Sequence, residues 1–260
     1  MFELISAIIM GIVEGLTEFL PVSSTGHLIL TAHLLGFEGE RAKTFEVVIQ
    51  FGAVLAVLVL YFKTFLRILT FKLGQGINFI HIVLAMLPAG VVGVAAHSLI
   101  KQYLFGPQTV LIGLVLGGLL MIIADRSKRA VTAEDLDDIT YKQAFLIGCF
   151  QILALWPGFS RSGSTISGGR LVGTSQKAAA EFTFIVSVPI MGGASLLDLI
   201  ENRAGLSGQD LPLFLIGFCA AFIVGMLAVV TFVNLMKKLK LSWFAYYRFV
   251  LAAIFFIILF

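Results

Sequence analysis

Two glutamates stand four residues apart in a mostly apolar stretch near the start of the chain. Glu14 and Glu18 therefore share one face of a helix. At the centre of a membrane helix one carboxylate costs about 3 kcal/mol, so a pair of them needs a compensating partner. A divalent cation, an arginine or a shared proton would serve. Alternatively, this end of the helix lies at the membrane surface and both carboxylates are hydrated.

A hydroxyl-rich segment follows directly, with the sequence PVSSTGH over residues 21–27. The proline ends one helix, and a serine can cap the next. The first N–H groups of a helix are free and carry positive partial charge, which suits an anion. Ser24 lies between Glu18 and His27, and a hydroxyl with a nearby base is typical of an activated nucleophile. The simpler interpretation is a capping serine beside a structural histidine.

A second polar segment interrupts an apolar stretch later in the chain, with the sequence PGFSRSGST over residues 157–165. Its distinctive residue is Arg161, whose planar guanidinium can bind a phosphate through two parallel hydrogen bonds. Gly158 and Gly163 let backbone N–H groups approach a ligand closely. Alternatively, Arg161 only neutralises one of the two glutamates.

Together, the two segments offer two helix N-termini, one arginine and many hydroxyls, which suit an anion with several oxygens. Carboxylates beside such an anion are explained if a metal ion bridges them, and oxygen ligands favour Mg²⁺, Ca²⁺ or Mn²⁺. The expected ligand is a phosphate or diphosphate on an amphiphile with a lipid tail.

Composition predicts that these segments lie within a membrane. Of 260 residues, 59% are hydrophobic and only 13% are charged, against about 25% charged in a soluble domain. This excludes a soluble enzyme, a secreted disulfide scaffold and a disordered protein. A nucleic-acid partner is not expected, and membrane lipid surrounds the chain.

The chain is expected to be all-helical and polytopic. We expect six spans, at residues 44–62, 79–100, 108–124, 180–200, 211–235 and 242–260. Residues 1–36 and 140–172 are also apolar, but each is broken near its middle by the polar segments described above. Irregular backbone at membrane depth is tolerated only where protein or a watery cavity surrounds it. Each of these regions is therefore interpreted as a re-entrant hairpin of two half-helices.

The two broken regions resemble each other, which predicts an internal repeat within a single integral membrane domain. Residues 1–124 and 140–260 would each form a hairpin plus three spans, joined by a polar cytoplasmic loop at 125–139. Three spans is an odd number, so the second repeat is inverted relative to the first. The two hairpin tips can then meet near the middle of the membrane.

Basic residues set the expected orientation, because lysine and arginine accumulate on the cytoplasmic side. One set of loops holds Lys63, Arg67, Lys72, Arg126, Lys128, Arg129, Lys142, Lys237, Lys238 and Lys240. The opposite loops hold only Arg41, Lys43, Lys101 and Arg203. Both termini are therefore predicted to lie outside. Arg248 is expected to extend toward the surface from the last span.

At the two polar segments the sequence resembles the undecaprenyl-diphosphate phosphatase family of the BacA/UppP type. The matching motifs are EGLTEFLPVSSTGH at residues 14–27 and PGFSRSGST at 157–165, and the resemblance covers essentially the whole chain. It implies hydrolysis of undecaprenyl diphosphate to undecaprenyl phosphate and inorganic phosphate, which recycles the lipid carrier of bacterial cell-wall synthesis. It also implies bacitracin resistance, a bacterial inner-membrane location, a site that opens toward the periplasm, and dependence on a divalent metal.

On this basis we assign expected roles to individual residues. The catalytic set is Ser24 as nucleophile, Glu18 as base, His27 as proton shuttle or phosphate contact, and Arg161 as the cation that stabilises the phosphoryl oxygens. Glu14 and Glu18 would hold Mg²⁺ or Ca²⁺. The residues expected to bind the diphosphate are Ser23, Thr25, Gly26, Ser160, Ser162, Gly163 and Thr165. Attack by water, with Ser24 only positioning it, stays open.

Two wider alternatives accompany this hypothesis. Inverted repeats with broken helices are also typical of transporters, so the chain could flip a lipid phosphate or couple transport to an ion. Glu46 and Gln50 could support the hairpins or lie at the membrane surface. A homodimer is among the assemblies that such a chain can form.

Overall fold

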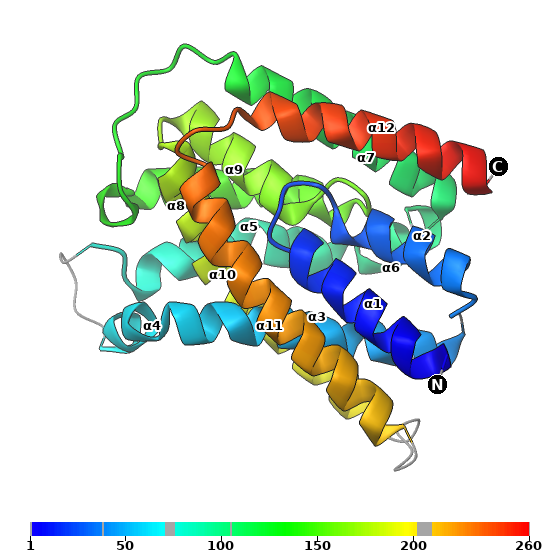
Figure 1. The fold of residues 1–260 in the computed structure, drawn as a ribbon. Coiled ribbons are helices and arrows are strands. Elements are labelled where there is room, and N and C mark those ends of the chain that lie inside the picture. The colour runs from blue at the N-terminus through cyan, green and yellow to red at the C-terminus, as the bar shows by residue number, and fades with distance from the viewer. Residues whose placement is uncertain (1, 38, 71–75, 105, 202–209, 260) are drawn as a thin grey trace.

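The computed structural model describes residues 2–37, 39–70, 76–104, 106–201 and 210–259 of the chain. Within these ranges the protein is built of helices and contains no β-strand (Figure 1). The all-helical prediction is therefore confirmed. Lys72 and Arg203, which were counted among the loop cations, lie outside the described residues.

Five described helices are long and apolar enough to cross a membrane. They match five of the six predicted spans and are α3 (Glu40–Leu60), α7 (Pro107–Asp125), α10 (Gln176–Glu201), α11 (Leu211–Leu235) and α12 (Leu241–Leu259).

The remaining predicted span, at residues 79–100, is wrong in its extent. Helix α5 covers only Phe79–Ala95, and a separate short helix, α6, follows at His97–Tyr103. Between them Ala96 leaves the helical conformation, with φ −106° and ψ 10°, where the apolar run meets the polar pair His97 and Ser98. A helix of 17 residues is about 26 Å long, which is shorter than the roughly 30 Å hydrocarbon core of a bilayer.

Each of the two broken regions forms a pair of helices with an irregular turn between them. The first pair is α1 (Phe2–Thr17) and α2 (Ser24–Leu35). The second is α8 (Tyr141–Gln151) and α9 (Arg161–Val172), with the 3₁₀ helix η2 (Ile152–Leu155) after α8. Both breaks therefore fall where the sequence predicts them. We call residues 18–23 the first break and residues 152–160 the second break.

Helix α1 is held against α11 by small residues. A Cβ atom at Gly15 would lie 2.7 Å from the carbonyl oxygen of Ala221 and 2.8 Å from the nitrogen of Gly225. Only glycine allows the two backbones to approach this closely, as in the small-residue contacts of membrane helices. This contact fixes the part of α1 that carries Glu14.

The polar segment between α7 and α8 packs onto the turn between α9 and α10. The backbone N–H of Thr132 donates to the Gly173 carbonyl oxygen over 2.8 Å, and Ala133 forms an isolated bridge with Thr174. The segment contains the 3₁₀ helix η1 (Leu136–Asp138), and Arg67 from α4 (Phe62–Leu69) pairs with Asp137. The predicted loop at 125–139 is therefore anchored to its neighbours.

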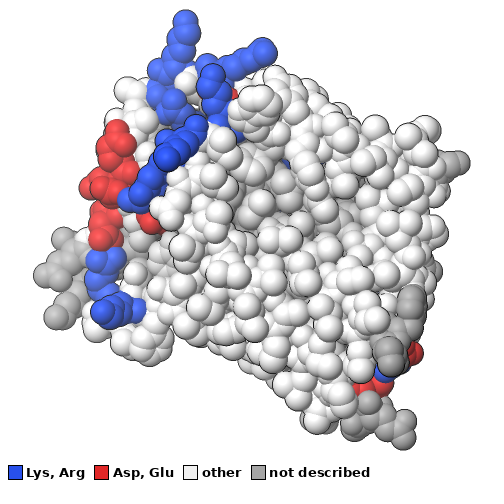
Figure 2. Space-filling model, viewed as in Figure 1, with Lys and Arg blue, Asp and Glu red and all other residues white. Residues whose placement is uncertain are grey.

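On the visible face of the protein, charged surface side chains are confined mainly to two ends of the molecule (Figure 2). Both termini lie at one end, and the segment between α7 and α8 lies at the other (Figure 1). The outer ends of the first helix pair lie at the end with the termini, and those of the second pair lie at the opposite end. The two breaks lie between these ends. On the visible face, charged side chains gather at the two ends (Figure 2). Such a surface indicates a multi-pass membrane protein.

Candidate functional site

The two breaks end in the same unusual backbone conformation. Ser23 and Ser160 have φ of 74° and 73°, and in the described ranges they are the only residues other than glycine with positive φ. Each serine caps the helix that follows: the Ser23 hydroxyl accepts from the Gly26 N–H over 3.4 Å, and the Ser160 hydroxyl accepts from the Gly163 N–H over 3.1 Å. Strained backbone of this kind clusters at functional sites.

A cavity of about 180 Å³ separates the two breaks. Gln50 of α3 and Met191 of α10 complete its walls. From the two helix pairs it is lined by Glu18, Ser23, Ser24, Thr25, Ala154, Trp156, Pro157, Gly158, Ser160 and Arg161. Two helix N-termini therefore border one polar cavity inside an apolar protein.

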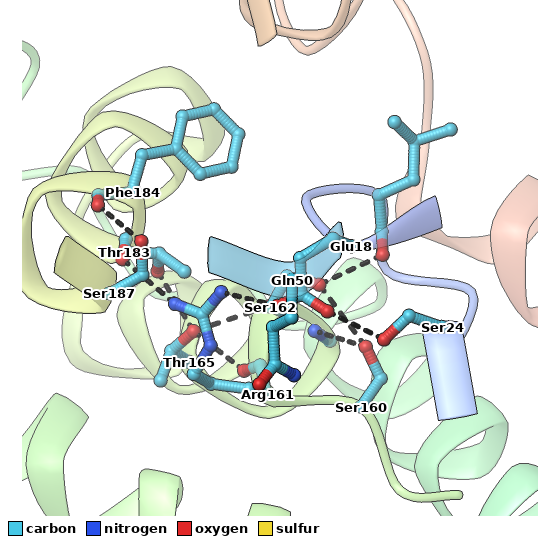
Figure 3. A network of polar contacts seen from close by, with 12 residues as sticks. Glu18, Ser24, Gln50, Ser160, Arg161, Ser162, Thr165, Thr183, Phe184 and Ser187 are labelled. Carbon is cyan, nitrogen blue, oxygen red and sulfur yellow. Dashed lines mark hydrogen bonds and ion pairs between the residues drawn. The ribbon is translucent and has the colours of Figure 1, made fainter. Parts of the chain in front are cut away.

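Glu18 connects the two breaks across this cavity. One carboxylate oxygen, Oε2, accepts a hydrogen bond from the Ser24 hydroxyl over 2.6 Å. The other, Oε1, accepts from Arg161 Nη2 over 3.0 Å (Figure 3). The side chains of Glu18 and Arg161 are only 5% and 12% exposed. A carboxylate held in this way can accept a proton from the hydroxyl while the arginine balances its charge.

Arg161 is fixed by a second contact, in which its Nη1 donates to the carbonyl oxygen of Thr183 in α10 over 3.2 Å. A guanidinium has five N–H donors, and these two contacts are the side-chain hydrogen bonds that Arg161 makes among the described residues. The remaining donors are available to the oxygens of a ligand in the cavity.

The predicted phosphate-binding residues divide into two groups. Ser23, Thr25 and Ser160 line the cavity. The others are not among its lining residues: Gly26, Ser162, Gly163 and Thr165.

Two hydroxyls of this second group stabilise the site through hydrogen bonds outside the cavity lining. The Ser162 hydroxyl donates to the carbonyl oxygen of Leu20 over 2.9 Å, which ties α9 to the first break. The Thr165 hydroxyl donates to the Arg161 carbonyl oxygen over 2.8 Å and accepts from Thr183 over 2.8 Å. These bonds fix the turn of helix that carries Arg161.

Glu14 lies one helical turn before Glu18 but is not among the residues that line the cavity. Its side chain is fully buried, and neither carboxylate oxygen has a hydrogen-bond partner among the described residues. Such a carboxylate is costly unless a cation or a proton satisfies it. Within the described ranges, no three histidine, cysteine, aspartate or glutamate side chains are grouped closely enough to hold a metal ion alone.

His27 lies beside the first break, and it does not line the cavity. Its Nδ1 is 2.7 Å from the Ser23 carbonyl oxygen, and its Nε2 is 2.7 Å from the Tyr247 hydroxyl of α12. The two rings are stacked, with an angle of 6° between their planes. Both ring nitrogens are therefore engaged in holding the backbone of Ser23 and the neighbouring helix.

The position of the Arg248 side chain differs from our prediction. Rather than extending toward the surface, its side chain is fully buried and donates hydrogen bonds to backbone carbonyls of both breaks and of α7. Because those partners are backbone atoms, no side-chain motif signals the contact. Gln50, for which the sequence left two alternatives, lines the cavity and accepts from the Ser195 hydroxyl over 3.3 Å.

The chain is similar to known proteins along nearly its whole length. The sequence model described as "Bacitracin resistance protein BacA" matches residues 7–254, nearly the whole chain. The chain belongs to this family. It is also 54% identical over 259 residues to proteins named "Undecaprenyl-diphosphatase 1" from Bacillus thuringiensis subsp. konkukian, Bacillus cereus and Bacillus anthracis. Each alignment covers 98% of this chain and 98% of the relative.

Proposed function

We propose that this chain is an undecaprenyl-diphosphate phosphatase whose site is the cavity between the two breaks. It hydrolyses undecaprenyl diphosphate to undecaprenyl phosphate and inorganic phosphate. The family and the names of the relatives support this activity. The structural observation that carries it is the Glu18 carboxylate, hydrogen-bonded to Ser24 on one side and paired with Arg161 on the other. Bacitracin resistance and a role in cell-wall synthesis follow from the family.

In the mechanism that we propose, Ser24 attacks the terminal phosphorus. Its hydroxyl proton passes to the Glu18 carboxylate while the new oxygen–phosphorus bond forms. The phosphoanhydride bond breaks, and undecaprenyl phosphate leaves with the bonding electron pair. Arg161 and the N–H groups at the start of α9 stabilise the charge on the transferred phosphoryl oxygens. Water then attacks the phosphorus of the phosphoserine, the bond between phosphorus and the Ser24 oxygen breaks, the oxygen takes the proton back from Glu18, and inorganic phosphate is released.

The other polar residues of the site assist this transfer. Ser23, Thr25 and Ser160 bind phosphate oxygens from the cavity wall. The residues that hold the two helix N-termini in place without lining the cavity are Gly26, Ser162, Gly163 and Thr165. His27 orients the first break through the Ser23 carbonyl oxygen, a role closer to a positioning residue than to the proton shuttle of our first hypothesis.

The carboxylates of Glu14 and Glu18 have the oxygen donors that a hard divalent cation prefers. Mg²⁺ is commonly held by one or two carboxylates together with substrate phosphate oxygens, and the buried Glu14 carboxylate lacks a partner among the described residues. We propose that Glu14 and Glu18 hold Mg²⁺ or Ca²⁺. The cation would supply positive charge beside the phosphate oxygens.

We further propose that the two helix pairs are re-entrant hairpins of an inverted repeat, in the bacterial inner membrane. The matching conformations of Ser23 and Ser160 support the repeat, as does the entry of the two pairs from opposite ends (Figure 1). The excess of lysine and arginine in one set of loops supports termini outside the cell and a site that opens to the periplasm. In a protein with Cys149 and Cys219 replaced, the Glu3→Cys variant should react with an impermeant thiol reagent in intact cells, whereas the Lys128→Cys variant should react only after permeabilisation.

The activity is tested with detergent-purified protein by measuring phosphate release from undecaprenyl diphosphate with Mg²⁺, Ca²⁺ or EDTA. We expect metal-dependent release that collapses in Glu18→Gln, Ser24→Ala and Arg161→Lys. Matched substitutions at positions that do not line the cavity, Glu3→Gln, Ser127→Ala and Arg126→Lys, should retain it. Wild-type protein that is folded yet releases no phosphate with any metal would overturn the proposal, and transport across sealed vesicles would then become the assay.

A further inference from the structure

In the part of the chain that the structure describes, Arg248 is a cation buried without an anionic partner. The Arg248 side chain in α12 has no exposed surface, and in the described ranges no carboxylate forms a salt bridge with it. Instead, its guanidinium donates to five backbone carbonyl oxygens, at distances from 2.8 to 3.4 Å. Burying a charge is costly unless every donor is satisfied. An apolar side chain would fill the same space without that cost.

The five carbonyls connect three separate parts of the site. Two belong to α7, at Gly113 and Leu114. Two belong to the second break, at Gly158 (2.8 Å) and Phe159 (2.9 Å). The last belongs to the first break, at Pro21 (3.4 Å). One side chain therefore holds both breaks against the same helix.

These contacts act on the peptides that lead into the strained serines. In a planar trans peptide the N–H points opposite to the carbonyl. The carbonyl of Phe159 points at Arg248, so the N–H of Ser160 points away from it, and Ser160 lines the cavity. The contact to Pro21 holds the first break two residues before Ser23. Arg248 also lies close to the start of α9, because a Cβ atom at Gly163 would be 3.2 Å from its Nη1.

We propose that Arg248 is a positioning residue for phosphoryl transfer. It fixes the two breaks relative to each other so that Ser24 and Arg161 face the same phosphate. This role rests on the proposed phosphatase function. Lysine would keep the charge but has three donors where arginine has five in a planar array, so Arg248→Lys should loosen both breaks.

The first test pairs Arg248→Lys with Leu251→Ala, which removes a buried packing residue one turn further along α12. We expect Arg248→Lys to lower kcat for phosphate release by about 100-fold with a small change in KM, since a misplaced reacting group costs about that much. Hydrogen–deuterium exchange should rise in peptides covering residues 18–28 and 157–165. Leu251→Ala, even where it lowers the melting temperature as much, should change neither readout by more than a few-fold.

A second pair keeps Arg248 in the protein, in case Arg248→Lys does not fold. A Cβ atom at Gly117 would collide with Arg248 Nη2 and with the Phe159 carbonyl oxygen, whereas one at Gly118 would meet the ring of Phe249. Gly117→Ala should therefore reproduce the loss of kcat and the faster exchange, and Gly118→Ala should not.

The outcomes separate this inference from the function on which it rests. Wild-type kcat and wild-type exchange in Arg248→Lys or Gly117→Ala would overturn the positioning role. Equal losses in the matched controls would also overturn it, because the effect would then be one of general packing. If wild-type protein releases no phosphate, the phosphatase proposal fails, and the exchange measurements still decide whether Arg248 holds the breaks.

Discussion

The two breaks have the same local backbone conformation but differ in the side chains that they present to the cavity. Each ends in a serine with φ near 74° whose hydroxyl caps the next helix. The residue after that serine differs, being Ser24 in the first break and Arg161 in the second. The same local fold thus presents a hydroxyl on one side of the cavity and a guanidinium on the other. Glu18 contacts both, so the two breaks form one site.

The largest effect is expected from the first break. Ser24→Ala removes the hydroxyl that we propose as the nucleophile, and turnover should fall at least about 1,000-fold, since loss of a nucleophile leaves only binding and electrostatic stabilisation. The measurement is phosphate release under saturating undecaprenyl diphosphate. Turnover within about tenfold of wild type in folded Ser24→Ala would assign the attack to water instead.

Arg161→Lys tests the second break. Lysine keeps the charge but cannot contact Glu18, Thr183 and a phosphate with the same planar array of donors. We expect kcat to fall about 100- to 1,000-fold, as for loss of one donor to a developing anion, while KM changes less. A rise in KM with unchanged kcat would show that Arg161 only binds substrate.

The sequence predicted where both breaks fall, because proline, glycine and capping serines leave clear local signals. Its candidate site residues line the cavity only in part, since the lining lacks Glu14, Gly26, His27, Ser162, Gly163 and Thr165. It did not predict the positive φ at Ser23 and Ser160, since capping residues usually adopt extended backbone. It misplaced Arg248, because an arginine near the end of an apolar span usually extends to water. Contacts to backbone carbonyls, and the distance across a cavity, depend on packing between helices that are remote in sequence.

Substitutions at the two strained serines compare the breaks directly. At either position alanine loses the cap and keeps the strained backbone, whereas glycine loses the cap but tolerates positive φ. Ser160→Ala and Ser23→Ala should each destabilise the protein by about 1 kcal/mol, and the glycine variants by less.

The shorter cap bond of Ser160 predicts the larger loss there, since it measures 3.1 Å against 3.4 Å at Ser23. Chemical unfolding in detergent, monitored by circular dichroism, measures these differences. Alanine variants that are as stable as the glycine variants would argue against strain at these two serines.

The smallest effect is expected far from both breaks, at the ion pair of Arg67 and Asp137, whose Nη2–Oδ1 distance is 2.5 Å. Burial raises the pKa of Asp137, but hydrogen bonds from Arg67 and from the Ile77 N–H outweigh it, so the pKa lies below its ordinary value. The stabilisation is therefore present above the ordinary aspartate pKa of about 3.9 and is lost as the pH falls through the lower folded value.

Asp137→Asn should accordingly lower the melting temperature slightly at pH 7, and wild type and variant should converge in acid. Phosphate release at pH 7 should stay within about twofold of wild type, because exposed ion pairs contribute little. A difference in melting temperature that does not shrink as the pH falls below the ordinary aspartate pKa, or a large loss of turnover, would contradict this account of the pair.

The central claim is that Ser24 of the first break attacks a phosphate held by Arg161 of the second. Its most direct test is a single-turnover reaction with undecaprenyl diphosphate radiolabelled at the terminal phosphate, quenched rapidly with acid and followed by peptide mapping. We predict transient label on Ser24 in wild type, slower labelling in Arg161→Lys and none in Ser24→Ala. Full turnover without label on Ser24 at any time, or labelling at an unchanged rate in Arg161→Lys, would contradict the claim.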